Sequence, residues 1–329
     1  MAAESAKRGT ISRRAVLAGG LAVAAVPRRA NAASGGLDLV VPGAAGSGWD
    51  QFARALADSL LGAGLIQRAE QTYLAGAHGD RAVAEFAAGR RGDAAAVLVH
   101  SSPLLIADAR SMPVFGSGEL VPIAGMVDDP AVVAVRPGMA DGDFTGLLAN
   151  AGEADDPVSV VGGSPPGGMD HLVLLAALRE AGIAETGVVY RGGDGGGAAL
   201  ASLIAGDADI FCGGLGEAIT AARNGAVRIV AIADDRRNAD LPEAATLTEQ
   251  GVPLVFRNWR AVYGSPGLTR EDRDRLRDLF AMLDQTPEWA DARAALGWRR
   301  RFSSGTDFIA DLAGHREEMS AFLRRAGFR

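Results

Sequence analysis

The stretch that decides the fold is Val41-Pro42-Gly43-Ala44-Ala45-Gly46-Ser47-Gly48-Trp49-Asp50, which joins an apolar run to an amphipathic segment. The preceding Leu37–Val41 has the composition of a short buried strand. After the glycine loop, Phe52, Leu56 and Leu60 recur at four-residue steps and predict a helix with one apolar face. A strand, a glycine-rich turn and a helix in this order are typical of an α/β protein.

The same design occurs twice more, in Val161-Gly162-Gly163-Ser164-Pro165-Pro166-Gly167-Gly168-Met169-Asp170-His171 and in Tyr190-Arg191-Gly192-Gly193-Asp194-Gly195-Gly196-Gly197. Glycine lets the backbone approach a ligand closely, and the first N–H groups of a helix lack intrahelical acceptors. The helix dipole adds partial positive charge there, which suits a carboxylate. We expect two of these helix starts to face each other across a cleft. The alternative is that the loops are ordinary turns, with Asp50 and Asp170 acting as N-caps.

Short apolar runs alternate with helical patterns along the chain, which predicts mostly parallel sheets flanked by helices. Further strands are expected at 71–74, 94–99, 121–127, 132–135, 158–161, 188–190, 210–212, 227–233 and 261–263. Helices are expected notably at 170–181, 198–205 and 217–223, followed by a helical, charged tail from Thr269 with breaks at Pro287 and Gly297. The length favours two domains, because one core seldom covers so many residues.

The N-terminus has the order of an export signal. Ser12-Arg13-Arg14 precedes an uncharged run from Ala15 to Val26, and Ala30-Asn31-Ala32 follows as a small-x-small cleavage signal. The paired arginines indicate the twin-arginine route, so we expect residues 1–32 to be removed and the protein to be periplasmic. A short membrane anchor is the alternative, although the run is shorter than the roughly 20 residues that span a bilayer.

The charge balance argues against polyanionic partners. The chain has a formal net charge of −7, and residues 1–32 carry six basic residues and one acidic residue, so the remainder carries −12. An acidic exterior disfavours nucleic acids and anionic lipid surfaces. Cys212 is the sole cysteine, which excludes an intramolecular disulfide, and the four histidines have no metal-ligand spacing. We therefore expect a monomer without metal or cofactor.

Several polar side chains near the predicted strand ends are candidate ligand contacts. His171 falls in the first turn after the second loop, where it could donate to a carboxylate. Ser101 follows a strand and could donate its hydroxyl, with a helix cap as the alternative. Ala77 and His78 lie in another glycine turn, and Trp49 could either line the cleft or fill the core. Arg191, with Arg257 and Arg260, is a possible carboxylate fork, although surface placement is the alternative for each.

Enzymatic motifs are weak. Gly193–Ala198 fits G-x-G-x-x-A, but the following acidic residues precede the next strand instead of ending it, which argues against nucleotide binding. There is no P-loop, and neither Ser47 nor Ser164 has the G-x-S-x-G setting of a hydrolase. We expect no catalytic residues and no enzyme, with a cleft hydrolase as the alternative.

The order and spacing of these motifs resemble the TctC/Bug family of extracytoplasmic solute-binding proteins, which serve tripartite tricarboxylate transporters. The resemblance covers essentially all of the chain after the signal, from Val41-Pro42 with Asp50 and Ala53-Arg54 to Pro266-Gly267-Leu268. Gly163-Ser164 followed by His171, and Tyr190-Arg191-Gly192 followed by Gly206-Asp207-Ala208-Asp209, lie between them. Two first-domain segments, 74–79 and 92–97, depart from the family pattern.

The resemblance implies a two-domain flytrap fold in which the chain crosses between domains near Val132 and Phe256. Domain I would comprise residues 33–132 and 257–329, and domain II residues 133–256. It implies capture of a small carboxylate, held by amides and short polar side chains, and delivery to the membrane subunits of such a transporter. A sensory receptor of the same fold is the alternative. The expected ligand-binding residues are Gly46, Ser47, Gly48, Trp49, Asp50, Ala77, His78, Ser101, Ser164, Gly167, Gly168, His171, Arg191, Gly193 and Asp194.

Overall fold

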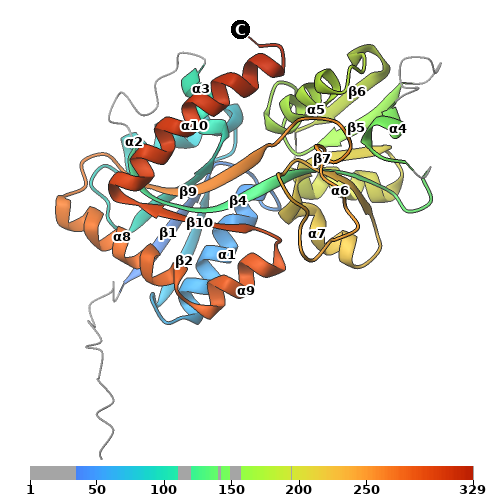
Figure 1. The fold of residues 1–329 in the computed structure, drawn as a ribbon. Coiled ribbons are helices and arrows are strands. Elements are labelled where there is room, and N and C mark those ends of the chain that lie inside the picture. The colour runs from blue at the N-terminus through green and yellow to red at the C-terminus, as the bar shows by residue number, and fades with distance from the viewer. Residues whose placement is uncertain (1–34, 110–119, 140–141, 149–156, 194, 329) are drawn as a thin grey trace, which may run out of the picture. The chain divides into compact units, whose positions relative to one another are not determined.

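The computed structural model describes residues 35–109, 120–139, 142–148, 157–193 and 195–328 (Figure 1). The predicted signal peptide and Asp194 lie outside these residues. Residues 32–329 form one compact unit. Among the described residues, no helix combines the length and apolar character needed to cross a membrane.

Ten strands and ten α-helices alternate along the described part of the chain, with 3-10 turns at Ala77–Gly79 and Glu185–Gly187. The strands are β1 Gly36–Val41, β2 Arg68–Tyr73, β3 Ala96–Ser101, β4 Val121–Val135, β5 Val158–Gly162, β6 Val188–Gly192, β7 Ile210–Gly214, β8 Arg228–Ile232, β9 Arg257–Gly264 and β10 Arg299–Ser304. The helices are α1 Gly48–Gly62, α2 Asp80–Gly89, α3 Pro103–Ala109, α4 Phe144–Leu148, α5 Met169–Glu180, α6 Gly196–Ala205, α7 Leu215–Arg223, α8 Arg270–Asp284, α9 Pro287–Ala295 and α10 Gly305–Arg325. Every expected strand overlaps an observed one.

The strands form two groups that share β4. Sheet A has the order β2-β1-β3-β9-β4-β10, and sheet B the order β6-β5-β7-β4-β8. In sheet A, β1 is parallel to β2 and β3, and in sheet B, β5 is parallel to β6 and β7. The three glycine loops follow β1, β5 and β6. The strands β4, β9 and β10 pair antiparallel, so both sheets are mixed. We call sheet A with α1–α3 and α8–α10 the sheet A half, and sheet B with α4–α7 the sheet B half.

Strand β4 runs from one sheet into the other (Figure 1). Its Pro130 is paired with Arg257 of sheet A, and the next residue, Ala131, with Gly214 of sheet B. The prediction of two separate strands, 121–127 and 132–135, is therefore wrong. The polar Asp128-Asp129-Pro130 stretch looked like a break, yet it stays extended because β9 pairs along it and β10 also pairs with Asp128. The domain boundaries after residues 132 and 256 stay a prediction.

The prediction of a wholly helical tail after Thr269 is also wrong, because Arg299–Ser304 forms β10 at the edge of sheet A. Three consecutive arginines obscured the strand. Each arginine pairs with a carboxylate. Arg299 pairs with Asp234 and Asp235, Arg300 pairs with Asp284, and Arg301 pairs with Asp128. Charged side chains on an edge strand also discourage pairing with other chains.

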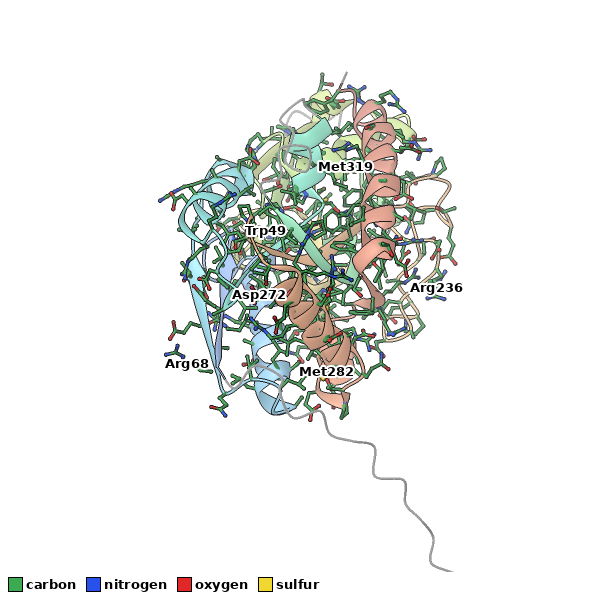
Figure 2. The ribbon with its side chains drawn as sticks, turned by 90° about the vertical axis from the view of Figure 1, so that its left-hand side faces the viewer. Trp49, Arg68, Arg236, Asp272, Met282 and Met319 are labelled. Carbon is green, nitrogen blue, oxygen red and sulfur yellow. The ribbon has the colours of Figure 1, made fainter. Side chains whose placement is uncertain are left out.

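The amphipathic helix predicted after the first loop is confirmed as α1. Phe52, Leu56 and Leu60 are completely buried. The Phe52 ring lies 6.4 Å from Trp289 and 5.9 Å from Trp298, so the C-terminal segment packs against α1. In Figure 2, Trp49 at the start of α1 lies within the molecule, whereas Arg68 and Arg236 lie at its rim.

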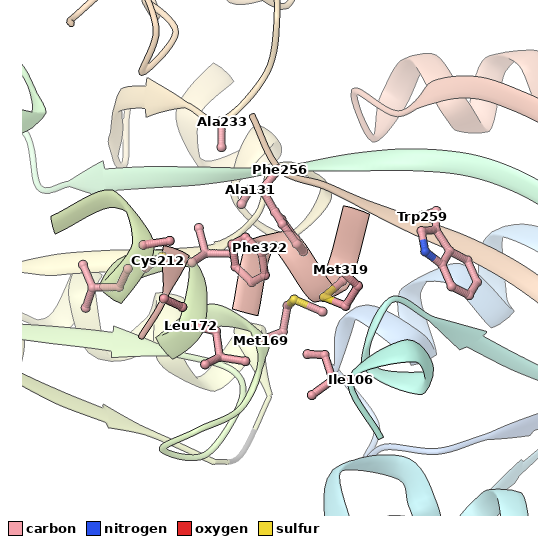
Figure 3. Close-up of a cluster of buried hydrophobic side chains, with 14 of the residues drawn as sticks. Ile106, Ala131, Met169, Leu172, Cys212, Ala233, Phe256, Trp259, Met319 and Phe322 are labelled. Atoms are coloured by element: carbon pink, nitrogen blue, oxygen red, sulfur yellow. The ribbon is translucent and has the colours of Figure 1, made fainter. Parts of the chain in front are cut away.

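One buried apolar cluster includes residues from both halves (Figure 3). Phe256, which precedes β9, packs on Phe322 of α10 with the ring centres 4.6 Å apart. Met169 and Cys212 from the sheet B half belong to the same cluster. Helix α10 contacts α3 and β4, as expected for the first domain, but it also contacts α5.

Candidate functional site

The first glycine loop is held rigid by side chains. The carboxylate of the buried Asp50 accepts hydrogen bonds from Gly46 N at 2.7 Å, Tyr73 Oη at 2.6 Å and Arg54 Nε at 2.9 Å. Burial works against the ionised form, but these bonds together hold the pKa of Asp50 below its usual value. The N-cap of α1 is Ser47, whose Oγ accepts from Asp50 N, so the expectation that Asp50 is the cap is wrong. Asp50 instead fixes the loop that precedes the helix.

Trp49 and the end of β3 form the adjoining wall. Trp49 Nε1 donates to Ser101 Oγ at 2.9 Å, and its ring lies 5.3 Å from that of His100. His100 is completely buried, and its Nδ1 accepts from Ser101 N at 2.9 Å. Burial lowers the pKa of His100 to about 4, so the ring is neutral near pH 7 with its proton on Nε2. That Nε2 has no hydrogen-bond partner among the described residues.

The turn from Gly76 to Gly79 is strained. Four successive residues have positive φ, with values of 127° at Gly76, 49° at Ala77, 55° at His78 and 99° at Gly79. Non-glycine residues adopt this conformation at a cost of about 1 kcal/mol or more each, and such strain tends to occur at functional sites. A Cβ atom on Gly79 would lie 2.8 Å from His100 Nε2, so this turn sits directly on the His100 ring. Ala77 and His78 themselves are exposed.

The second glycine loop closes on itself through Ser164 and Asp170. Asp170 Oδ2 accepts from Ser164 N at 2.8 Å, and Ser164 Oγ accepts from Asp170 N at 2.9 Å. The N-cap of α5 is Gly168, so the expectation that Asp170 is the cap is wrong. Tyr190 Oη donates to Ser164 O at 2.7 Å and fastens the loop to β6.

His171 braces the same loop from inside the helix. Its Nδ1 accepts from Gly167 N at 3.0 Å, and its ring lies 4.6 Å from that of Tyr190. Burial lowers the pKa of His171, so the neutral ring carries its proton on Nε2. This leaves the Nε2–H group without a role in the loop, and the role of His171 as a ligand contact stays a prediction.

The third loop lies against the second through bare backbone. Gly195 N donates to Gly163 O at 3.0 Å, and a Cβ atom on Gly163 would collide with the backbone at Gly195 and Gly196. Gly163 therefore has to be glycine because another main chain occupies the space of its side chain. Gly193 is exposed in the same loop.

The structure brings the first and third loops into direct contact. A Cβ atom on Gly195 would lie 3.2 Å from Ser47 Cα, and one on Gly197 would lie 2.9 Å from Gly46 O. Gln51 Nε2 of α1 also donates to Gly216 O of α7 at 2.8 Å. The starts of α1 and α6, which belong to different halves, therefore adjoin each other.

A buried ion pair lies beneath these loops. Arg260 of β9 is 3% exposed and pairs with the fully buried Asp129 of β4, with Nη2 and Nε at 2.5 and 3.2 Å from Oδ2. Asp129 Oδ1 also accepts from Gly216 N at 3.0 Å. Glu217 of α7 lies close by, and burial and the neighbouring Asp170 raise the pKa of Glu217 to about 7. The sequence analysis did not select Asp129 or Glu217. The only signals were an acidic pair inside an apolar run and a glutamate at the start of a predicted helix, where its side chain can reach back to the N-cap amide.

The arginines proposed as carboxylate forks are engaged elsewhere. Arg191 donates to Ser159 Oγ and to Asp207 O, toward the amino end of β5 and away from the glycine loops. Arg257 pairs with Asp234 and Asp235 at 2.9 and 2.7 Å. Arg260 is held by Asp129. Among the expected site residues, Gly46–Asp50 and Ser101 belong to the sheet A half and Ser164, Gly167, Gly168, His171 and Gly193 to the sheet B half, whereas the Arg191 side chain is directed toward the amino end of β5.

No group of three or more His, Cys, Asp or Glu residues that could hold a metal ion occurs within the described ranges. Ser164 Oγ and His171 Nδ1 each accept a backbone N–H, and no hydrogen bond joins these two side chains among the described residues. The site offers helix-start amides, two serine hydroxyls and one imidazole donor, which are groups that bind an anion.

Two sheets joined through the shared strand β4, with glycine loops adjoining where they meet, are typical of two-domain binding proteins. The chain is similar to the periplasmic binding protein BugD, with 19% identity over 89% of this chain and 98% of that chain and a TM-score of 0.79. It is also similar to MatC from Rhodopseudomonas palustris with bound malate, with 20% identity, 88% and 98% coverage and a TM-score of 0.75. A UPF0065 protein of Bordetella bronchiseptica is 24% identical over 293 residues, which are 88% of this chain and 85% of that protein.

Residues 103–298 match the model of the tripartite tricarboxylate transporter family receptor, TctC. The chain therefore belongs to the TctC family. This confirms the family resemblance seen in the sequence and, together with the structural likeness to BugD, the two-domain binding-protein fold. The matching family is one of receptors and not of enzymes.

Proposed function

We propose that this protein is a periplasmic solute-binding protein that captures a small di- or tricarboxylate between the sheet A and sheet B halves. The observation that carries the proposal is the meeting of the α1 and α6 starts, beside the Ser164–His171 loop. Helix starts from both halves supply amide donors and partial positive charge, so a ligand with two anionic ends would engage both at once.

The binding groups follow from the geometry. The first-turn amides of α1 at Gly48 and Trp49 would hold one carboxylate, with the Ser101 hydroxyl beside them. The Ser164 hydroxyl and His171 Nε2 would hold the other. Ser101 Oγ accepts from Trp49 and Ser164 Oγ from Asp170 N, so the hydroxyl proton of each remains available to a ligand. No arginine is required, which agrees with the engagement of Arg191, Arg257 and Arg260 elsewhere.

Capture would proceed by closure of the two halves around the ligand, with the differential contacts shifting the population toward the closed form. The closed, liganded form would then deliver its ligand to the membrane subunits of a tripartite tricarboxylate-type transporter. The malate bound to the structurally similar MatC and the receptor family support this role. Export by the twin-arginine route and a monomeric state belong to the same proposal.

Isothermal titration calorimetry of residues 33–329 tests the function against malate, succinate, adipate, citrate, glutamate and a neutral sugar. We expect saturable binding of at least one carboxylate and none of the sugar. Ser164→Ala, which removes one hydroxyl donor to the ligand, is expected to weaken binding about tenfold. Ser320→Ala on the exposed face of α10 is the matched control and should leave affinity unchanged. Binding of the sugar alone would overturn the proposal.

A further inference from the structure

The side chain of Glu217 lies where helix starts from both halves converge. Its Oε2 accepts from Gly214 N, the amide of the N-cap residue of α7, at 3.1 Å. A Cβ atom on Gly48, the first residue of α1, would lie 3.1 Å from Glu217 Oε1. One on Gly196, the first residue of α6, would overlap the carboxylate itself. The carboxylate thus rests on the backbone at the starts of three helices.

Glycine is required at Gly48 and Gly196 for this placement. A side chain at Gly196 would displace the carboxylate, and one at Gly48 would also meet Arg260 Nη2 at 2.8 Å. Bare backbone at a helix start is the usual way to admit an anion. Here the carboxyl group of Glu217 occupies the position.

The surrounding charges are balanced between attraction and repulsion. Three helix starts and Arg260 favour the carboxylate. Asp170 and Asp129, the other charged groups that act on it, and its removal from water oppose it. The carboxyl group of Glu217 thus joins α7 of the sheet B half to the start of α1 of the sheet A half.

From this geometry we infer that Glu217 is an internal carboxylate that holds the α1 and α6 starts together when no ligand is bound, and that it competes there with an anionic ligand. The first part depends only on the contacts around Glu217. The second part rests on the proposed function, because it requires that a carboxylate ligand uses the same helix starts.

Three variants test the inference. Glu217→Ala removes the carboxylate, and Glu217→Gln keeps its shape and the acceptor for Gly214 N while removing the charge. Glu249→Gln is the matched control, because Glu249 also accepts a backbone N–H, from Thr246 at 2.7 Å, but lies on the surface beside Arg237. Thermal melts establish that each variant is folded, and Glu217→Gln serves if Glu217→Ala is not.

The ligand-free radius of gyration, measured by small-angle X-ray scattering, reports whether the halves separate. We expect an increase in Glu217→Ala and a smaller one in Glu217→Gln, with Glu249→Gln unchanged. Unchanged values in both Glu217 variants would overturn the inference. Malate titration reports the competition, and we expect Glu217→Ala to bind about three- to tenfold more tightly than the unaltered protein.

The two measurements separate the inference from the proposed function. If the Glu217 variants expand but no variant binds malate or any other carboxylate, the internal contact is supported and carboxylate capture is contradicted. Malate binding that is equal or weaker in both Glu217 variants would overturn the competition even if the radius changes.

Discussion

The loops of the two halves are stabilised in different ways. In the sheet A half, the Gly46–Asp50 loop is held by side chains: Asp50 gathers Gly46, Tyr73 and Arg54, and Trp49 is bonded to Ser101. In the sheet B half, the Gly162–Gly168 and Gly192–Gly197 loops rest on each other through backbone, with glycine wherever they touch. The stability of the Gly46–Asp50 loop should therefore be sensitive to the loss of side-chain atoms. The stability of the two loops in the sheet B half should be sensitive to the gain of side-chain atoms.

The largest effect is expected for Gly163→Ala. The added methyl group would collide with the backbone at Gly195 and Gly196, and backbone cannot move aside as a flexible side chain can. Overpacking of this kind costs about 3 kcal/mol, and more where the backbone has to shift. Denaturant unfolding measures the loss. Gly314→Ala inside α10, where the new methyl group meets no atom within 4 Å, is the control and should be neutral or stabilising. Equal stability of the two variants would contradict the proposed close approach.

His100 should make stability depend on pH. The pKa of His100 is about 4 in the folded protein, against an ordinary value of 6.5. Between these two pH values the folded state therefore binds fewer protons than the unfolded state. The stabilisation is complete above pH 6.5 and is lost as the pH falls through 4, with an upper limit of about 3 kcal/mol. The free energy of unfolding should therefore fall more steeply over this window in the unaltered protein than in His100→Gln. Parallel curves would show that burial of His100 does not control its titration.

A smaller loss is expected for Asp50→Asn. The amide can accept fewer hydrogen bonds and carries no charge for Arg54, so the loop loosens by about 1–3 kcal/mol. Because the pKa of Asp50 is lowered in the folded protein, the ionised carboxylate stabilises the fold above its unfolded pKa, and this is lost as the pH falls through the folded value. Chemical denaturation at pH 7 and at pH 3 should thus separate the variant from the unaltered protein more widely at pH 7 than at pH 3.

The smallest effect is expected for Trp49→Phe, which keeps the aromatic ring against His100 but removes the Nε1 donor to Ser101. The loss should be about 1 kcal/mol. Ser101→Ala should cost a similar amount, and the double variant little more, because both substitutions break the same bond. Strictly additive losses in this double-mutant cycle would exclude the bond as the source of the effect.

The local pattern of apolar residues was sufficient to predict most of the helices and strands. The four-residue spacing of Phe52, Leu56 and Leu60 identified α1, and the apolar runs identified the strands, because burial of one face leaves its period in the sequence. The pattern failed where long-range partners override local character. The Asp128–Pro130 stretch continues β4 because sheet neighbours satisfy its backbone, and Arg299–Arg301 forms β10 because acidic side chains from distant segments pair with it.

The candidate site divides in the same way. Its glycine loops, with Ser164 and His171, were visible from the sequence, because turn residues before a helix start are a local signal. The tertiary structure alone decided that Asp50 and Asp170 fasten loops instead of capping helices, that Arg191 points away, and that Glu217 meets Gly48 and Gly196. These outcomes depend on which segments adjoin in space, and residues far apart along the chain carry no mark of that contact in their own neighbourhoods.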